Sequence, residues 1–144
     1  MNALVEPASL AAPRAGRCFS EQFTITAEDM EGFAAITGDR RPIHAAADFA
    51  RQSGFSGRVV YEGLVVARLS RSIARCGATE TDGLWGELRV EFHHPLHVGE
   101  AALLRLSVDE VLPESSVACL SFRLDTVQRP VASGSVDILM RAVA

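Results

Sequence analysis

The chain has 144 residues, of which 48% are hydrophobic and 22% are charged, as is typical of one soluble globular domain. Its net charge of -4 argues against nucleic acid as the main partner, because phosphate binding requires clustered basic side chains. No apolar run approaches the roughly 20 residues needed to cross a bilayer, so we expect no membrane association. Three widely spaced cysteines, which we expect to be buried, and the lack of a signal-peptide pattern predict a cytoplasmic protein.

The first part of the chain predicts an arm, a strand and a helix, in that order. An Ala- and Pro-rich stretch over residues 1–16 predicts a loose N-terminal arm, followed by a single domain over residues 17–144. Alternating apolar and polar side chains predict a strand over residues 18–25. Thr26 is a typical helix N-cap residue, and the apolar spacing after it predicts a helix that ends at Gly38.

The loop after this helix carries Asp39 and His44, with Pro42 between them. Proline biases the residue before it toward an extended conformation, so the helix cannot continue and the chain must bend. A bent loop can turn a carboxylate and an imidazole toward one water molecule, and such a pair can remove a proton and return it elsewhere. On spacing alone the simpler interpretation is favoured, in which Asp39 caps a turn and His44 is an unrelated histidine.

The remaining elements predict the fold class. A short helical stretch is expected around residues 46–51, and a largely apolar helix over residues 63–76, ended by Gly77. A helix this apolar is normally buried on several sides. Extended, alternating segments predict strands over residues 84–92, 101–111, 116–124 and 130–140. Helices followed by strands predict an α+β domain in which an antiparallel sheet covers a helix.

Three segments resemble, in order, motifs of the MaoC-like, (R)-specific enoyl-CoA hydratase (hydratase 2) family. Residues 33–44, FAAITGDRRPIH, are similar to its hydratase motif, an aromatic residue followed by Ser/Thr-Gly-Asp-x-Asn-Pro-aliphatic-His. Residues 63–67, GLVVA, resemble the start of its central helix, and residues 92–100, FHHPLHVGE, resemble its Phe-x-x-Pro turn. The resemblance covers nearly all residues after the arm. It implies a hot-dog fold, a curved antiparallel sheet wrapped around a central α-helix, in a homodimer or higher oligomer.

The same resemblance implies an activity and a site. Members of this family interconvert trans-2-enoyl and (R)-3-hydroxyacyl thioesters linked to CoA or to acyl-carrier protein. Asp39 and His44 would hold the water, and the backbone amide of Gly63, at a helix start, would stabilise the thioester oxygen. Water addition needs only positioned acid–base groups and an oxyanion site, so we expect no cofactor and no metal.

Two residues depart from the family pattern. Arg41 replaces its Asn, and Glu62, preceded by Tyr61, replaces the His before the helix glycine. Arginine only donates hydrogen bonds, so Arg41 could pair with Asp39 and lower its basicity, turn toward a substrate phosphate, or lie on the surface. We predict that the substrate is contacted by Arg41, Tyr61, Glu62 and Leu64.

Other functions remain open from the sequence. A hot-dog acyl thioesterase could use Glu62 or Asp39, and a non-catalytic hot-dog domain could bind acyl thioesters without turnover. A cluster of histidines, His93, His94 and His97, invites a metal proposal. Neighbouring strand residues point to opposite faces, so we expect these histidines to lie at the end of a strand without a metal.

Overall fold

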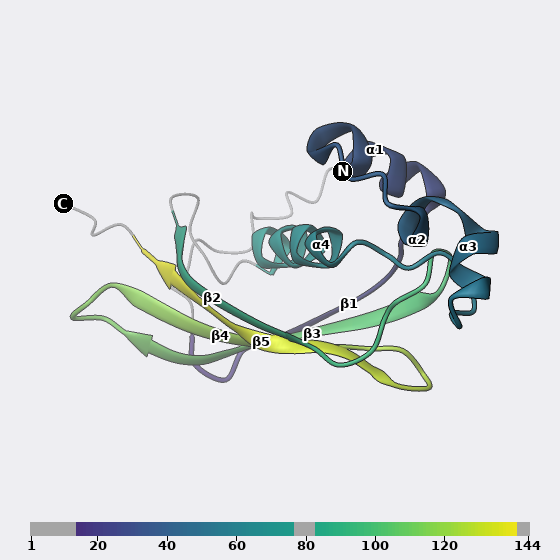
Figure 1. Ribbon diagram of the computed structural model, residues 1–144. Helices are drawn as coiled ribbons and strands as arrows, with labels where there is room; N and C mark the ends of the chain where they lie inside the picture. Colours follow the sequence, from purple (N-terminus) through teal and green to yellow (C-terminus); the bar gives the residue numbers. More distant parts are fainter. Residues whose placement is uncertain (1–13, 77–82, 141–144) are drawn as a thin grey trace, which may run out of the picture.

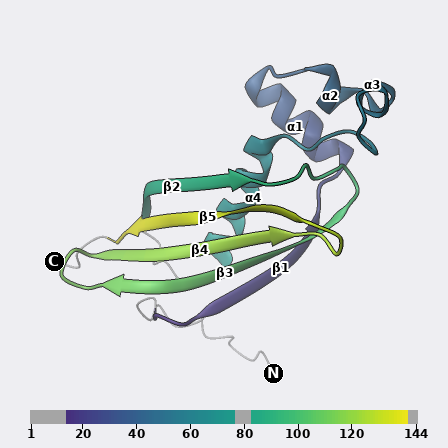
Figure 2. The ribbon, with the colours of Figure 1, turned by 60° about the horizontal axis from the view of Figure 1, so that its bottom comes forward.

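The computed structural model describes residues 14–76 and 83–140. These residues form one antiparallel sheet with the strand order β1-β3-β4-β5-β2, and the sheet curves around one long helix (Figures 1 and 2). Three shorter helices gather beyond one end of the sheet. The predicted α+β architecture is confirmed. In chain order the elements are β1 (Cys18–Thr24), α1 (Ala27–Thr37), α2 (Pro42–Ala45), α3 (Ala47–Gln52), α4 (Glu62–Arg75), β2 (Leu84–Phe92), β3 (Ala101–Leu112), β4 (Val117–Asp125) and β5 (Pro130–Leu139).

Local signals fix both ends of α1. The hydroxyl of Thr26 accepts a hydrogen bond from the amide of Asp29 at 3.1 Å, and the Asp29 carboxylate accepts one from the Thr26 amide at 2.9 Å. This reciprocal pair satisfies amides that the first helical turn leaves free. Gly38 ends the helix with a φ of 73°, which favours glycine, and its amide donates to Ala34. The chain therefore turns immediately before Asp39.

The long helix α4 lies on the concave side of the sheet and buries one face against it (Figure 1). Val65, Leu69 and Ile73 join the inward side chains of the strands in one hydrophobic core. Burying each such side chain contributes about 1.5–3 kcal/mol to the stability of the fold. Ala67 and Ala74 on the opposite face are exposed. The expectation of burial on several sides is wrong for the single chain, because the sheet covers only one side of the helix.

An ion cluster fixes α4 against β1. The Glu21 carboxylate accepts hydrogen bonds from the buried hydroxyl of Ser72 at 2.8 Å and from Arg75 at 3.2 Å. The guanidinium groups of Arg68 and Arg71 lie 3.6 Å and 3.8 Å from the same carboxylate. Glu21 thus joins the strand to two turns of the helix, and this contact holds α4 at a set rotation on the sheet.

Some sequence predictions have a different outcome or lie outside the described residues. Cys18 is exposed on β1, Cys119 is half-buried and Cys76 is buried, so burial of all three cysteines was wrong. Gly77 and most of the predicted arm over residues 1–16 lie outside the described residues, so the domain boundary stays a prediction. Within the ranges described, none of the helices has both the length and the hydropathy needed to span a membrane.

Candidate active site

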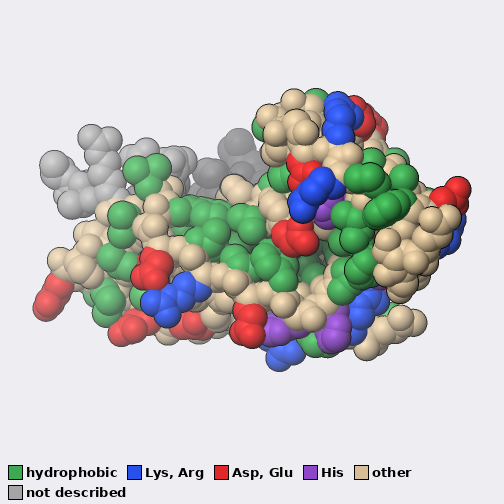
Figure 3. All heavy atoms as spheres, in the orientation of Figure 1, with side chains coloured by type: hydrophobic (Ala, Val, Ile, Leu, Met, Phe, Trp, Pro, Cys, Tyr) green, Lys and Arg blue, Asp and Glu red, His purple; other side chains and the backbone are tan. Residues whose placement is uncertain are grey.

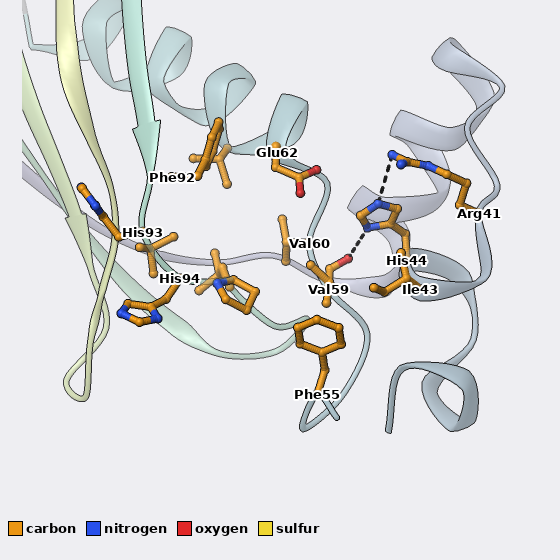
Figure 4. A pocket seen from close by; sticks show the side chains of 14 residues that line it. Arg41, Ile43, His44, Phe55, Val59, Val60, Glu62, Phe92, His93 and His94 are labelled. Carbon is orange, nitrogen blue, oxygen red and sulfur yellow. Dashed lines mark hydrogen bonds between the residues drawn. The ribbon is translucent and has the colours of Figure 1, made fainter. Parts of the chain in front are cut away.

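The segment that carries Asp39 and His44 is partly helical. Pro42 is the first residue of α2, a helix of one turn, and His44 is its third residue. Proline suits this position because its fixed φ is helical and the amide hydrogen that it lacks would have no partner in a first turn. The sequence predicted a loop over the whole segment. The helical turn directs the His44 ring toward Val59, in the segment before α4 (Figure 4).

His44 is held in one orientation and is only 2% exposed. Its Nδ1 lies 2.7 Å from the carbonyl oxygen of Val59. A carbonyl only accepts, so Nδ1 carries the hydrogen and Nε2 of the neutral ring keeps its lone pair. The ring stacks on Tyr61 with 4.3 Å between centroids, and Arg58 donates to the His44 carbonyl at 2.8 Å. The lone pair of Nε2 therefore has a defined direction.

Asp39 forms a two-pronged ion pair with Arg41. The Nε and Nη2 atoms of Arg41 donate to the two carboxylate oxygens at 2.9 Å and 2.7 Å, and the Arg41 amide donates at 3.2 Å. These hydrogen bonds from Arg41 lower the pKa of Asp39 to about 2, so Asp39 is ionised at any pH near neutrality. The Nη2 atom of Arg41 also lies 3.4 Å from Nε2 of His44. This outcome matches the first of the three possibilities for Arg41.

A cavity of about 360 Å³ opens beside these residues (Figure 4). Its walls are largely apolar, with polar side chains at its two ends, as is common for sites that bind small molecules. Figure 3 shows charged and histidine side chains gathered next to hydrophobic side chains at the helical end of the molecule. The cavity is lined by Arg41, Ile43, His44, Phe55, Val59, Val60, Glu62, Val65, Phe92, His93, His94, Pro95, Leu96 and Val131.

Glu62 is an exposed carboxylate in this cavity. It is the first residue of α4, and its side chain lies at the same end of the cavity as Arg41 and His44 (Figure 4). Among the residues that the structure describes, Glu62 has no hydrogen-bond or ion-pair partner. Its charge adds to that of Asp39, the main cause, in raising the pKa of Arg41. Glu62 is thus close enough to act electrostatically on the Arg41 guanidinium.

Gly63 follows Glu62 in the first turn of α4, a helix end without a side-chain cap. Within the described part of the chain its amide donates to no protein acceptor. A side chain here would collide with a neighbour, because a Cβ atom would lie 2.6 Å from Cζ of Phe33. The Phe33 ring packs on Tyr61 with 4.7 Å between centroids. The glycine therefore leaves a free amide at the helix N-terminus, where partial positive charge accumulates.

The structure brings together most of the predicted site residues, but not all of them contact the cavity. Arg41, His44 and Glu62 line it. The Asp39 carboxylate is not part of its wall and faces Arg41, and Gly63 is not part of the wall but directly follows Glu62. Tyr61 is buried behind His44, and its hydroxyl donates to the Asp39 carbonyl at 2.5 Å. Tyr61 therefore positions His44 and Asp39, and it does not line the cavity as a substrate contact would.

Leu64 is also absent from the cavity wall. Its side chain is partly buried and packs against the hydrophobic core. Leu64 is two residues after Glu62 in α4, so the two side chains point in different directions around the helix. The predicted substrate contact of Leu64 is therefore not part of this cavity.

His93 and His94 line the opposite end of the cavity, which the sequence did not predict. The strand β2 ends at Phe92, so the alternation of faces does not extend to these two residues. Nε2 of His93 lies 2.8 Å from the Ser133 hydroxyl. His97 lies apart from them, next to Arg129, with 3.2 Å between Nδ1 and Nη2. No group of three metal-binding side chains is present among the described residues.

Comparison with known proteins shows which family has this arrangement. The model of the "MaoC like domain" family matches residues 9–116. A 3-hydroxybutyryl-CoA dehydratase from Methylorubrum extorquens AM1 is 31% identical over 97 residues, which are 67% of this chain and 61% of that protein. The alignment thus spans less than two-thirds of that relative's length.

Two solved structures extend the comparison to the fold. The (R)-hydratase from A. caviae involved in PHA biosynthesis superposes with a TM-score of 0.83 at 18% identity, covering 91% of this chain and 99% of that one. The unliganded R-hydratase PhaJ1 from Pseudomonas aeruginosa gives a TM-score of 0.80 at 25% identity, covering 91% and 84%.

A curved antiparallel sheet around one helix, with a cavity at the helix N-terminus, defines a hot-dog domain. The chain belongs to the MaoC-like dehydratase family, because the family model matches well over half of its residues.

Proposed function

We propose that this protein is a hydratase/dehydratase that interconverts trans-2-enoyl and (R)-3-hydroxyacyl thioesters linked to CoA or to acyl-carrier protein. The observation that carries the proposal is the His44 ring, whose Nδ1 is bound to Val59. Its Nε2 carries a lone pair beside a cavity with apolar walls, with Nη2 of Arg41 3.4 Å away. The named activities of the relatives, dehydration of 3-hydroxybutyryl-CoA and (R)-hydration, support the same chemistry.

The hydration step follows from this arrangement. Nε2 of His44 removes a proton from water while the water oxygen bonds to C3 of the enoyl group. The electrons of the C2–C3 double bond move toward the thioester, whose oxygen becomes negative. The imidazolium then returns the proton to C2, and the oxygen loses its charge. One water is added and the protein ends in its starting state. The family resemblance of the sequence predicts that Asp39 holds the same water.

The amide of Gly63 is the proposed donor to the negative thioester oxygen. Preorganised amides at a helix N-terminus stabilise such charge without moving. Gly63 is not itself part of the cavity wall, but it directly follows Glu62, which is, so its amide lies at the end of the cavity where we propose that the thioester binds. Phe55 and Phe92 provide apolar wall for the acyl chain.

Replacing Gly63 by Ala should lower kcat for enoyl hydration by about 100-fold, as much as the loss of one such donor, because the amide remains but the methyl group hinders close approach of the thioester oxygen to it. The new methyl group would meet Phe33, and the displaced ring would disturb Tyr61 and so His44. Steady-state kinetics on crotonyl-CoA measure the effect. The matched control is Gly57→Ala, because a Cβ at Gly57 has no atom within 4 Å. Equal kcat values for the two variants would contradict the assignment of Gly63.

A direct assay separates the proposed hydratase from a thioesterase. The purified protein should remove the enoyl absorbance of crotonyl-CoA without releasing free CoA thiol. Release of thiol with the enoyl group intact would instead favour hydrolysis, with Glu62 or Asp39 as the carboxylate. Binding of the thioester with neither change would favour a non-catalytic acyl-thioester-binding domain.

We also propose that the protein forms a homodimer through the β2 side of the sheet. β2 is an edge strand, and Leu84, Leu88 and Phe92 on it are exposed, with Leu84 at 71%. An apolar edge strand is a template for pairing with a second chain. Sedimentation velocity should give twice the mass of one chain; the mass of a single chain at micromolar concentration would contradict the dimer.

The cellular compartment stays a prediction. The wide spacing of Cys18, Cys76 and Cys119 in the sequence is typical of a reducing compartment and supports a cytoplasmic location.

A further inference from the structure

The Asp39 carboxylate is poorly placed to hold the reacting water. Both of its oxygens accept hydrogen bonds from the Arg41 side chain, at 2.9 Å and 2.7 Å, and one also accepts from the Arg41 amide. It is not part of the cavity wall. Its pKa, which Arg41 lowers to about 2, makes it a weak base. In this chain Asp39 binds Arg41 where the family motif leaves the carboxylate beside an asparagine.

Glu62 has the properties that Asp39 lacks. It lines the cavity, is exposed to it, and has no hydrogen-bond or ion-pair partner among the residues described. It is the first residue of α4, so its backbone position is fixed by a helix of 14 residues. Figure 4 shows the Glu62 carboxylate at the same end of the cavity as the His44 ring. A substrate that enters this end meets the carboxylate and the imidazole together.

Arg41 interacts differently with the two carboxylates, Asp39 and Glu62. Its guanidinium is bound to Asp39 through Nε and Nη2. The charge of Glu62 adds to that of Asp39, the main cause, in raising the pKa of Arg41, but Arg41 and Glu62 form no direct ion pair in the structure. Asp39 therefore prevents Arg41 from turning fully onto Glu62. With Arg41 held back, the oxygens of Glu62 remain available to water.

We propose that Glu62 is a catalytic residue that holds the reacting water together with His44, and that Asp39 and Arg41 are positioning residues. The proposal rests on the hydratase function proposed above. Glu62 accepts a hydrogen bond from one O–H of the water, while Nε2 of His44 takes the proton of the other O–H. The oxygen bonds to C3, and the proton on His44 passes to C2. Glu62 stays ionised throughout, stabilising the imidazolium, and no net proton is gained or lost.

The test compares carboxylate and amide at position 62. Glu62→Gln should lower kcat for crotonyl-CoA hydration by about 100-fold with little change in KM, because the amide keeps the shape but not the charge. Thermal unfolding should show an unchanged Tm. If Glu62 had only a structural role, the glutamine amide would replace it and kcat would stay close to that of the wild type. A loss in kcat of less than about tenfold overturns the proposal.

A second measurement tests whether the carboxylate is the group that position 62 supplies. In Glu62→Ala the side chain leaves space beside His44, and added formate should raise kcat by at least about tenfold by replacing the carboxylate. A smaller rise overturns the proposal. Formate should not stimulate Glu62→Gln, where the amide fills the space.

A comparison of two losses in kcat tests the role of Asp39. The double variant Asp39→Asn with Arg41→Asn removes the ion pair together with the arginine that would otherwise turn onto Glu62, and it should lose less kcat than Glu62→Gln. A loss equal to or larger than that of Glu62→Gln would make Asp39 the water-holding carboxylate and overturn the inference while leaving the hydratase function intact. A wild type that hydrates no enoyl thioester would instead reject the proposed function itself.

Discussion

Replacing His44 by Gln is expected to lower kcat for enoyl hydration by about 1000-fold, within the usual range for loss of a general base. The glutamine amide can still donate to the Val59 carbonyl, as Nδ1 does at 2.7 Å, so the segment before α4 stays in place. The amide cannot, however, take a proton from water at neutral pH. The loss should therefore fall on kcat, with KM changed only a few-fold.

Crotonyl-CoA kinetics on His44→Gln and on a matched His97→Gln variant measure this effect. His97 is another largely buried histidine, but it contacts Arg129 and is not part of the cavity wall. His97→Gln should lose some stability and keep its kcat within about threefold. A His44→Gln variant as active as this control would exclude His44 as the proton carrier.

Replacing Gly134 by Ala should lower the free energy of unfolding by at least about 3 kcal/mol. Gly134 lies in β5 opposite Val90 of β2, and a Cβ atom at this position would lie 1.9 Å from the carbonyl oxygen of Arg89. Phe122 closes the space on another side, with its Cε1 atom 3.0 Å from the same Cβ. Because the nearest atom belongs to the backbone, relief requires β2 to move away from β5.

Urea unfolding of Gly134→Ala and of Gly86→Ala provides the measurement. Gly86 lies in β2, and a Cβ there would meet only side-chain atoms of Leu139, at 3.2 Å. That side chain can rotate, so Gly86→Ala should cost less than about 1.5 kcal/mol. Similar midpoints for the two variants would contradict this account of β2–β5 packing. Since Phe92, His93 and His94 follow from β2 into the cavity, Gly134→Ala should also weaken substrate binding.

The elements that the sequence predicted well are those with local signals. Thr26 and Gly38 bound α1 through hydrogen bonds within a few residues of each other, so their chemistry can be recognised in the sequence. The one-turn helix α2 was missed because four residues are too few to show helical periodicity. The exposed face of α4 was missed because apolar composition does not reveal how many sides of a helix the sheet covers.

The site was predictable in part for similar reasons. The spacing of Asp39 and His44 alone favoured a turn cap and an unrelated histidine, and the family resemblance supplied Asp39, His44 and Gly63 as site residues. The two-pronged bond between Arg41 and Asp39 depends on side-chain rotamers, which spacing leaves open. The position of Tyr61 behind His44 depends on the path of the chain into α4, a tertiary feature that the sequence does not specify locally.

The configuration of the product tests the central claim most directly. The wild-type protein is incubated with crotonyl-CoA and with a longer trans-2-enoyl thioester, and the product is analysed by chiral chromatography after release of the acid. We expect the (R)-3-hydroxyacyl product from the wild type, formed at least about 1000-fold more slowly by His44→Gln. An (S) product, or free thiol with the enoyl group intact, would contradict the assignment of this cavity to (R)-specific hydration.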